Sequence, residues 1–361
     1  MSHENYEGQA VAIKHVRIVG MGLIGTSIGL GLASKGVSVE VEDMDPKALG
    51  IAQDLLQHAL KNGTPDLVVI ATPPEATFAA LKREFELNPS SRFIDVGSVK
   101  SKLQQEVHAL SELKSRFVGS HPMAGRENSG PASAQADLFT GRAWFLTPSS
   151  YSDSDVVESA KSLIELLGAT SYVWDADDHD ELMAQISHLP QLISSALSIL
   201  IENRAVGVDL AGQGLRDMTR LGAGDAQLWT QIFLSNKEPL LSAIRSFQER
   251  IAEFQHSIIE SDEAELQRLI KLGNAGRSKV GGKHGAQPRN YSYLHVVIKD
   301  EPGALSELFN ECAALSANIE DLSIEHSPGQ YTGLITLAFS PEDAQRVQDH
   351  LIQKNWKVHR Q

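Results

Sequence analysis

Short hydrophobic runs, each bounded by polar or glycine-containing turns, recur through residues 1–173 and alternate with stretches of helical periodicity. Strand-length runs that alternate with helices are typical of βαβ units, so the pattern predicts an α/β domain with a mostly parallel, doubly wound sheet. Ligands bind beyond the carboxyl ends of the strands in such sheets. After a first strand that begins at Val16, the predicted strands are residues 37–41, 66–71, 92–96, 116–119, 143–147 and 170–173.

The pattern changes at residue 174, after which long runs of helical periodicity replace the strand signals up to residue 272. These runs, notably residues 182–201 and 228–259, predict an all-α domain. Their apolar surface exceeds what a small helical bundle needs, so we expect burial against a second copy of the chain. Pro190 is expected to kink the first helix or to begin a new one, which would turn Ser187 and His188 out of the regular packing.

The run 182–201 contains no Asp, Glu, Lys or Arg and is long enough to span a bilayer. It also carries a proline, a histidine, two glutamines and several serines, which favours a helix buried in a soluble protein. The acidic pairs before it are expected to form a solvated helix start; they are Asp177-Asp178 and Asp180-Glu181.

Residues 273–290 contain five glycines, four lysines or arginines and no acid, which favours a flexible linker over an interaction tail. Residues 291–361 show strand and helix patterns in the order βαββαβ, which predicts a ferredoxin-like split βαβ domain. Because its helices cover one face of the sheet, the other face or an edge strand is expected to pair with a second copy. The predicted strands are 291–298, 319–325, 331–339 and 356–359, and the predicted helices are 304–316 and 341–353.

Length and charge narrow the class of protein. A chain of 361 residues is long enough for two or three domains with a core each. The net charge of −14 argues against a nucleic-acid or anionic-membrane partner, because both need a basic face. Cys312 is the only cysteine, and no spacing of histidines or carboxylates predicts a metal site. Residues 1–14 lack the apolar core of a signal peptide, so we expect a cytoplasmic protein.

A glycine-rich turn follows the first predicted strand, where Gly20, Gly22 and Gly25 fit the pattern G-x-G-x-x-G. In Rossmann-type domains the first glycine permits a tight turn, the second lets the backbone approach a pyrophosphate, and the third lets the helix pack on the strand. The helix N-terminus then faces the phosphates. The alternative is a glycine turn without a ligand. Against it, the second strand ends at Glu42 and Asp43, where an acid is expected to bind the ribose hydroxyls.

The same acids bear on the choice of cofactor. Glu42, Asp43 and Asp45 form a negative cluster that would repel the 2′-phosphate of NADP, so NAD is the expected cofactor. The turn after the third strand reaches the same edge of the sheet. The expected cofactor-binding residues are Gly20, Met21, Gly22, Leu23, Ile24, Gly25, Asp43, Thr72 and Pro73.

Two further turns at this edge carry candidate catalytic side chains. His121 follows a predicted strand and precedes a proline, where a histidine is well placed to act as a base near neutral pH. Ser98, on the neighbouring turn, is placed to hydrogen-bond the same substrate oxygen. Each has a structural alternative: a turn histidine with satisfied hydrogen bonds, and a serine that caps a helix.

Polar residues of the helical region indicate a pocket. Ser187, His188 and Gln191 lie in an otherwise apolar run, where each costs free energy unless it has a partner. A core histidine bonded to a backbone carbonyl is the alternative for His188. Trp229 is by its pattern a core residue.

Two arginines of this region suit an anionic substrate. Arg216 and Arg220 are four residues apart and would present cations on one helix face, and arginine captures carboxylates with two hydrogen bonds. Exposed ion pairs with Asp217 or Asp225 are the alternative.

Taken together, these stretches resemble the prephenate and arogenate dehydrogenases of tyrosine biosynthesis, in the form that has a C-terminal ACT domain. The resemblance covers about residues 16–236, and the histidine and serine turns are more specific than the glycine motif. The tail resembles an ACT domain at Lys299-Asp-Glu-Pro-Gly-Ala-Leu305. The other matching stretches are Gly20-Met-Gly-Leu-Ile-Gly-Thr-Ser, Asp95-Val-Gly-Ser-Val-Lys100, Ser120-His-Pro-Met-Ala-Gly125, Ile186-Ser-His-Leu-Pro190 and Gly214-Leu-Arg-Asp-Met-Thr-Arg220, followed by Trp229.

The resemblance implies NAD-linked oxidative decarboxylation of prephenate to 4-hydroxyphenylpyruvate. His121 is then the residue that takes the proton of the ring hydroxyl while hydride leaves the same carbon for the nicotinamide, and carbon dioxide departs as the ring becomes aromatic. Ser98 helps to hold the hydroxyl, and Arg220 binds a substrate carboxylate. The substrate-binding residues that the resemblance suggests are Arg220, Ser187, His188, Gln191, Trp229 and Arg126.

One departure from the family pattern leaves the substrate open. Many relatives have a histidine at the position of Gln191, close to the substrate side chain. A glutamine amide can donate to the keto group of prephenate or accept from the amino group of arogenate. The partner of the second carboxylate is also open, with Arg126 the first candidate and Arg216 the next.

The ACT-like tail implies feedback inhibition by L-tyrosine, and the helical region implies a homodimer. The expected domains are residues 1–173 for NAD, 174–272 for substrate binding and dimerisation, 273–290 as linker and 291–361 as regulatory domain. The expected tyrosine-binding residues are Asp300, Pro302, Gly303, Ala304, Asn318 and Ile319.

Two other interpretations compete with this one. A 3-hydroxy-acid dehydrogenase commonly uses a lysine in its helical domain, and here that helix offers Ser187 and His188 and no lysine. A catalytically silent NAD or amino-acid sensor would use the glycine turn and the tail only as binding modules. The presence of Ser98, His121 and Arg220 argues against this loss of catalysis.

Overall fold

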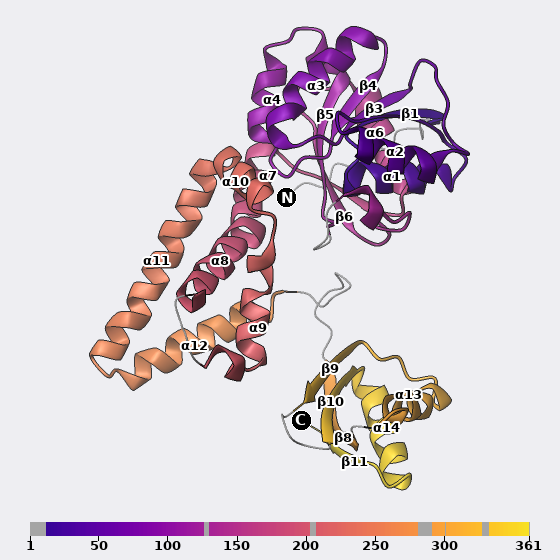
Figure 1. Ribbon diagram of the computed structural model, residues 1–361. Coiled ribbons are helices and arrows are strands. Elements are labelled where there is room, and N and C mark those ends of the chain that lie inside the picture. The colour runs from indigo at the N-terminus through magenta and orange to yellow at the C-terminus, as the bar shows by residue number, and fades with distance from the viewer. Residues whose placement is uncertain are drawn as a thin grey trace. The chain divides into compact units, whose positions relative to one another are not determined.

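The computed structural model describes residues 12–125, 130–202, 207–280, 291–299, 301–326 and 332–360 (Figure 1). Two site candidates, Arg126 and Asp300, lie outside these residues. The chain divides into two compact units, Met1–Glu253 and Phe254–Gln361, each with its own hydrophobic core.

A seven-stranded sheet in the order β2-β1-β3-β4-β5-β6-β7 forms the centre of the first unit. Neighbouring strands are parallel except β5 and β6, which confirms the mostly parallel sheet predicted from the sequence. The chain crosses from β2 past β1 to β3, and a ligand crevice forms at such a reversal of strand order. The strands are β1 (His15–Val19), β2 (Ser38–Glu42), β3 (Leu67–Ile70), β4 (Arg92–Asp95), β5 (Phe117–Pro122), β6 (Ala143–Thr147) and β7 (Thr170–Val173).

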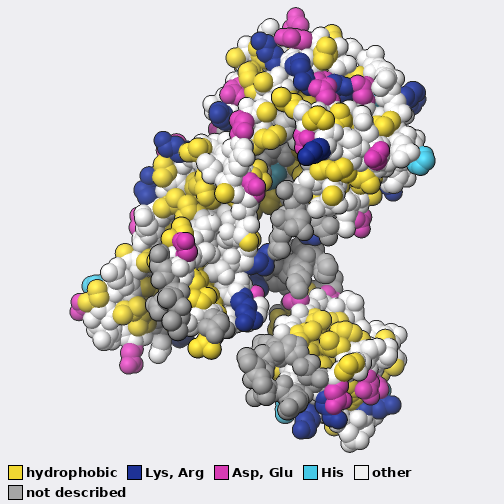
Figure 2. Space-filling view, viewed as in Figure 1, with side chains coloured by type: hydrophobic (Ala, Val, Ile, Leu, Met, Phe, Trp, Pro, Cys, Tyr) yellow, Lys and Arg dark blue, Asp and Glu magenta, His cyan; other side chains and the backbone are white. Residues whose placement is uncertain are grey.

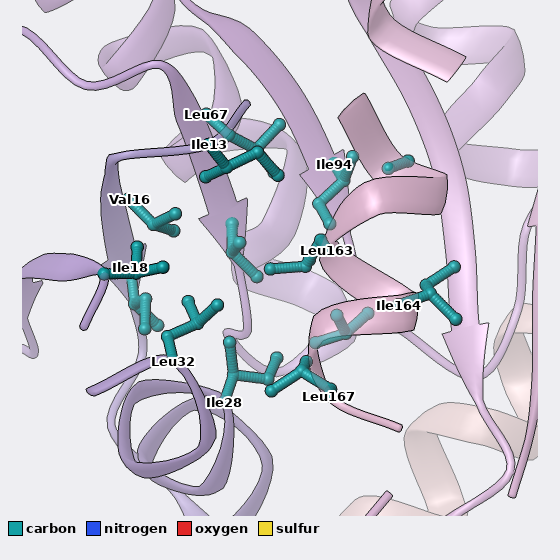
Figure 3. Packing of buried hydrophobic residues seen from close by; sticks show 14 of the residues in the cluster. Ile13, Val16, Ile18, Ile28, Leu32, Leu67, Ile94, Leu163, Ile164 and Leu167 are labelled. Atoms are coloured by element: carbon teal, nitrogen blue, oxygen red, sulfur yellow. The ribbon is translucent and has the colours of Figure 1, made fainter. Parts of the chain in front are cut away.

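Helices cover both faces of this sheet. Along β3, Leu67 belongs to one buried cluster and Val68 to another, because successive side chains of a strand point to opposite faces. Figure 3 shows Ile28 of α1 and Leu163 of α6 packed in the first cluster. The helices of this region are α1 (Leu23–Ala33), α2 (Pro46–Leu56), α3 (Pro74–Leu87), α4 (Ser101–His108), α5 (Leu113–Arg116) and α6 (Ser154–Leu166), with a short turn η1 (Pro131–Ser133).

Strand β5 differs from its prediction in a way that matters for the site. The expected strand ended at Gly119 and left His121 in a turn, whereas β5 continues to Pro122 and pairs His121 with Phe145 of β6. Pairing with the antiparallel strand β6 keeps this backbone extended, and the ladder ends in a bond from Met123 N to the Ala143 carbonyl of 2.9 Å. His121 is therefore fixed by a sheet rather than by a loop.

The described residues between 174 and 280 form helices and turns and no strand, as predicted. A continuous helical stretch, Ala176–Glu202, consists of α7 (Ala176–Met183), a π-helical turn η2 (Ala184–His188) and α8 (Leu189–Glu202). The π turn ends just before Pro190, which has no N–H to donate and whose ring crowds the carbonyl four residues earlier. The elements that follow are η3 (Val208–Leu210), α9 (Gln213–Thr219), η4 (Arg220–Ala223), α10 (Ala226–Ser235) and α11 (Lys237–Ile259).

The stretch Ala176–Glu202 is also the one described helix that is long and apolar enough to cross a membrane, judged by length and composition. Only 22% of its most apolar window is buried within the chain. Its polar residues His179, Asp180, His188 and Gln191 are nevertheless buried, so one side of the helix packs on protein.

The second unit contains a separate antiparallel sheet. Its elements follow the predicted order βαββαβ, and the four strands lie in the order β11-β8-β10-β9 with every neighbouring pair antiparallel. Leu294 of β8, Leu308 of α13 and Val347 of α14 belong to one buried cluster. The elements are β8 (Ser292–Lys299), α13 (Ala304–Ala314), β9 (Asp321–His326), β10 (Thr332–Phe339), α14 (Pro341–Gln353) and β11 (Lys357–Arg360).

The predicted linker begins later than expected. Helix α12 (Glu263–Arg277) continues through Gly273 and Gly276, so the first part of the segment 273–290 is helical. Asp262 caps its N-terminus by accepting from Glu265 N at 3.0 Å. Two glycines cost a helix about 1 kcal/mol each relative to alanine, which a capped helix of this length tolerates.

Candidate active site

The glycine turn has the geometry of a phosphate cradle. Gly20 has a φ of +99°, and a Cβ there would lie 2.5 Å from the Ala71 carbonyl oxygen. A Cβ on Gly25 would lie 1.9 Å from the Gly20 carbonyl oxygen, so this helix position needs glycine for contact with the turn. Gly22, which precedes the first residue of α1, has nothing within 4 Å of such a Cβ. Open space at a helix N-terminus fits a dinucleotide pyrophosphate.

The two acids after β2 have different partners. Asp43 Oδ2 accepts from Met21 N at 2.5 Å, so this carboxylate lies against the glycine turn. Glu42 forms ion pairs with Arg17 and Arg83 instead. Asp43 is therefore the acid beside the cradle, while the charge of Glu42 is compensated.

The remaining cofactor candidates lie in the predicted segments. Leu23 and Ile24 form the first turn of α1 and are half-buried. Thr72 and Pro73 follow β3, where Pro73 precedes α3 and the Thr72 hydroxyl lies 3.2 Å from that of Thr77.

His121 belongs to a chain of hydrogen bonds that the sequence did not reveal. Its Nδ1 lies 3.0 Å from Nε2 of His179, and Nδ1 of His179 lies 2.8 Å from Oδ1 of Asp180. The Asp180 carboxylate also accepts from the backbone N–H groups of Lys100 and Ser101, each at 2.9 Å. Asp180 is 2% exposed, so its assignment to a solvated helix start was wrong.

Asp180 is buried because it supplies a missing helix cap. Helix α4 begins at Ser101, and its capping residue Lys100 makes no side-chain cap bond. The first N–H groups of a helix need acceptors, and a carboxylate there also interacts favourably with the helix dipole. Asp180 of α7 provides both across the unit.

Lys100 holds the strand that carries His121. Its side chain is buried, forms an ion pair with Asp95, and donates from Nζ to the Ser120 carbonyl at 2.6 Å. Ser98 lies half-buried in the turn between Asp95 and Lys100. The capping position of α4 belongs to Lys100, so the alternative of Ser98 as a helix cap does not apply.

The surroundings keep His121 neutral. Burial, together with the nearby positive charges of His179, Lys100 and His188 in their protonated forms, holds the pKa of His121 well below its usual value. Burial by itself would raise the pKa of Asp180, but hydrogen bonds from His179, Ser101 and Lys100 lower it overall. A neutral imidazole beside an ionised carboxylate relay is the arrangement of a general base.

His188 is connected to the same network. Its Nδ1 lies 3.1 Å from Nδ2 of Asn236, which also donates to the Asp180 carbonyl at 2.7 Å. Burial lowers the pKa of His188 to about 4, against a smaller opposite effect of Asp180. Its ring centroid is 6.3 Å from that of Trp229, and Ser187 beside it is half-buried.

Gln191 is tied to a neighbouring turn. It is 3% exposed, and its Nε2 donates to the Leu221 carbonyl at 2.7 Å. A Cβ on Gly224 would lie 3.2 Å from that nitrogen and 2.5 Å from Nε1 of Trp229, so the turn is closely packed on both side chains. In this structure the amide therefore holds the segment that starts with Arg220.

The arginine candidates are exposed. Arg216 lies on α9 and Arg220 begins the turn η4. Asp225 accepts from Leu228 N at 2.7 Å as a helix cap, and Asp217 accepts from Gln213. Asp217 and Asp225 thus have hydrogen-bond partners other than the arginine side chains that the ion-pair alternative assumed.

The expected tyrosine-binding residues do not all lie at one site. Pro302, Gly303 and Ala304 line a cavity of about 260 Å³ in the second unit, together with residues of β8, β9 and β10. Asn318 is exposed and donates to Glu320 at 2.9 Å, and neither it nor Ile319 lines the cavity.

Sequence reasoning missed His179, Asp180, Lys100 and Asn236. The signal that could have found the first two is their spacing from Met183, since residues three and four positions before a buried residue share its helix face. The acidic neighbours obscured this pattern.

Comparisons with known proteins identify a family for the chain. The family models for the nucleotide-binding domain and the dimerization domain of prephenate dehydrogenase match residues 19–173 and 175–272. A probable prephenate dehydrogenase of Streptomyces niveus is 28% identical over 353 residues, 94% of this chain and 98% of that protein.

Two solved structures are also similar. The prephenate dehydrogenase of Aquifex aeolicus, in complex with hydroxyphenyl propionate and NAD+, is 27% identical with a TM-score of 0.69, over 76% of this chain and 100% of that one. The Synechocystis arogenate dehydrogenase is 28% identical with a TM-score of 0.64, over 73% and 99%.

Proposed function

The chain belongs to the prephenate dehydrogenase family, and we propose that it oxidises prephenate with NAD to 4-hydroxyphenylpyruvate, carbon dioxide and NADH in the synthesis of L-tyrosine. The observation that carries the proposal is the neutral His121, held by His179 and Asp180 on the same sheet that carries the dinucleotide cradle. The oxidation of a ring alcohol requires a base and a hydride acceptor, and this domain offers a candidate for the first and a binding turn for the second.

The proposed chemistry needs few steps from the protein. His121 takes the proton of the ring hydroxyl, while Ser98 hydrogen-bonds the same oxygen and orients it. NAD, when bound, accepts the hydride from the hydroxyl carbon. Loss of carbon dioxide then sends the electron pair of the broken carbon–carbon bond into the ring, and the resulting phenolate takes the proton back. Because aromatisation drives the reaction, positioning and proton transfer are the main contributions of the protein.

Prephenate carries two carboxylates, so cations must bind it in a chain of net charge −14. We assign one carboxylate to Arg220, the first residue of the turn held by Gln191. Arg126 remains the candidate for the second. Ser187, His188 and Trp229 are proposed to line the pocket, a role that the contacts of His188 with Asn236 and Trp229 support.

NAD is proposed to bind along residues 20–25, with Asp43 on the adenosine ribose and Thr72 and Pro73 beside it. The open space at Gly22 and the position of Asp43 support this assignment. We keep the functional division into an NAD domain (1–173), a substrate and dimerisation domain (174–272) and a regulatory domain (291–361) as part of the proposal.

We propose a homodimer formed through the helical region of a cytoplasmic enzyme. Several large apolar side chains of this region are exposed, among them Leu200 at 72%, Leu210 at 83% and Leu234 at 70%. Figure 2 shows hydrophobic side chains gathered on the visible surface of the helices. Burying such a surface against a second copy removes it from water.

We propose that the C-terminal unit is an ACT domain that binds L-tyrosine. The βαββαβ order and the cavity at Pro302, Gly303 and Ala304 support this. Truncation after Val280 and the full-length variant Ala304→Leu, which fills the cavity, should both abolish inhibition by tyrosine. If inhibition persists in both variants, tyrosine acts at the active site instead.

The function is tested by following NADH formation with prephenate and, separately, arogenate, each with NAD or NADP. We expect turnover of prephenate with NAD and none in His121→Asn. A preference for arogenate would keep the mechanism and change the substrate, in which case the amide oxygen of Gln191 is the acceptor for the amino group. Absence of turnover with both substrates would contradict the proposal.

A further inference from the structure

We propose that His179 and Asp180 are positioning residues that hold His121 in the tautomer with its proton on Nδ1, so that Nε2 presents the lone pair to the substrate. The proposal rests on the proposed role of His121 as the base. Neither residue touches the substrate in this scheme, because each acts through the imidazole of its neighbour.

The order of donors and acceptors along the chain determines the tautomer. An ionised carboxylate can only accept hydrogen bonds, so Nδ1 of His179, 2.8 Å from Asp180, must carry a proton. In neutral His179 the other nitrogen, Nε2, is then an acceptor. Nδ1 of His121, 3.0 Å from it, must therefore be the donor. Neutral His121 is left with an unprotonated Nε2.

The free nitrogen is available to a ligand. Within the described residues no hydrogen bond reaches Nε2 of His121, and this atom is absent from the buried polar atoms that lack a partner. His121 as a whole is half-buried rather than sealed in the core. A base needs this combination, an unprotonated nitrogen that a substrate can reach and a second nitrogen fixed by a hydrogen bond.

Asp180 is held firmly enough to act as the fixed end of the chain. Its two carboxylate oxygens accept from the first N–H groups of α4, and its own carbonyl accepts from Asn236. His179 is fully buried, with its ring 5.3 Å from that of Phe145. The charged or titratable groups that face the His121–His179 pair are Asp180, Lys100, Asp95 and His188.

The two substitutions Asp180→Asn and His179→Gln separate positioning from folding. The amide of Asp180→Asn can donate to Nδ1 of His179, which would move the His179 proton to Nε2 and force His121 to carry its proton on Nε2. In His179→Gln the amide oxygen can still accept from Nδ1 of His121, so the productive tautomer should survive. Asp178→Asn, an exposed acid on the same helix, is the matched control.

The primary measurement is long-range ¹H–¹⁵N NMR of the full-length protein with NAD and ¹⁵N-labelled histidine, which reports which imidazole nitrogen carries the proton. His121 is identified by its missing signals in His121→Asn. We expect protonated Nδ1 in the wild type, Asp178→Asn and His179→Gln, and protonated Nε2 in Asp180→Asn. The readout needs no substrate, so it stays meaningful even if the enzyme proves inactive on prephenate.

Kinetics provide the second readout. Loss of the correct tautomer should lower kcat on the order of 10³-fold in Asp180→Asn with little change in KM, whereas His179→Gln should keep most of the activity. In His179→Leu the acid limb of the kcat profile should move to higher pH, because one of the causes that lower the pKa of His121 is removed. Protonated Nδ1 on His121 in folded Asp180→Asn, or wild-type kcat in His179→Leu, would overturn the proposal.

Discussion

Acidification should destabilise the first unit through His188, and the size of the effect follows from its burial. Burial lowers the pKa of this side chain from 6.5 to about 4 in the folded protein. Between these values the unfolded chain binds a proton that the folded chain does not bind. Stability is therefore fully present above pH 6.5 and is lost as the pH falls toward 4.

The magnitude can be worked out from the linkage relation. At pH 5.5 the contribution of one such group to the free energy of unfolding falls by about 1.4 kcal/mol, and the full loss below pH 4 is about 3 kcal/mol. A loss of this size is a substantial part of the stability of an ordinary domain.

The perturbation that isolates this group is His188→Gln, which removes the titration and keeps an oxygen that can accept from Asn236. Urea unfolding of the wild type and the variant at pH 7.5 and pH 5.5 gives the acid loss of each. We expect the wild type to lose about 1.4 kcal/mol more than the variant. His58→Gln, an exposed histidine of the same unit, controls for loss of a histidine. Equal acid losses in wild type and His188→Gln would refute the reasoning.

Three further substitutions test the cradle and the substrate contact. Gly25→Ala places a Cβ 1.9 Å from the Gly20 carbonyl oxygen, so it should lower both the Tm and the affinity for NAD. Gly22→Ala adds a methyl group to open space, so calorimetry should find an unchanged Tm together with weaker NAD binding in titrations. Arg220→Gln should raise KM for prephenate about 10- to 100-fold with a smaller change in kcat, because a charged hydrogen bond to a carboxylate is worth about 1.5–3 kcal/mol; an unchanged KM would remove Arg220 from the site.

Features that depend on neighbouring residues in sequence could be predicted from the sequence. The turn at Gly20 follows from a local pattern, because the positive φ of Gly20 and the close approach of Gly25 to the Gly20 carbonyl oxygen both arise within residues 20–25. The π turn before Pro190 is local in the same way. Both the sheet and the βαββαβ unit follow from periodicity.

Features that depend on segments far apart in the sequence could not be predicted from the sequence. Asp180 is buried because α4, about 80 residues earlier in the chain, begins without a side-chain cap of its own. His121 is fixed in a strand because β6 pairs with it. Gln191 binds the Leu221 carbonyl because of how a later turn packs, so its chemistry could not be assigned from residue type. In each case the interacting residue lies far away in the sequence, so a local sequence pattern does not reveal it.

The π turn at Ala184–His188 has a consequence for the alignment of Asp180 and His188 with Asn236, which contacts both. In a regular α-helix each residue advances by about 100°, so residues eight apart, such as Asp180 and His188, would differ in phase by about 80°. The wider π turn advances less per residue and brings His188 back toward the phase of Asp180, and Asn236 contacts both. A π turn amounts to one inserted residue in an α-helix. Removing one residue from this turn would therefore shift every side chain after it out of register with the relay, even though the helix itself would become more regular.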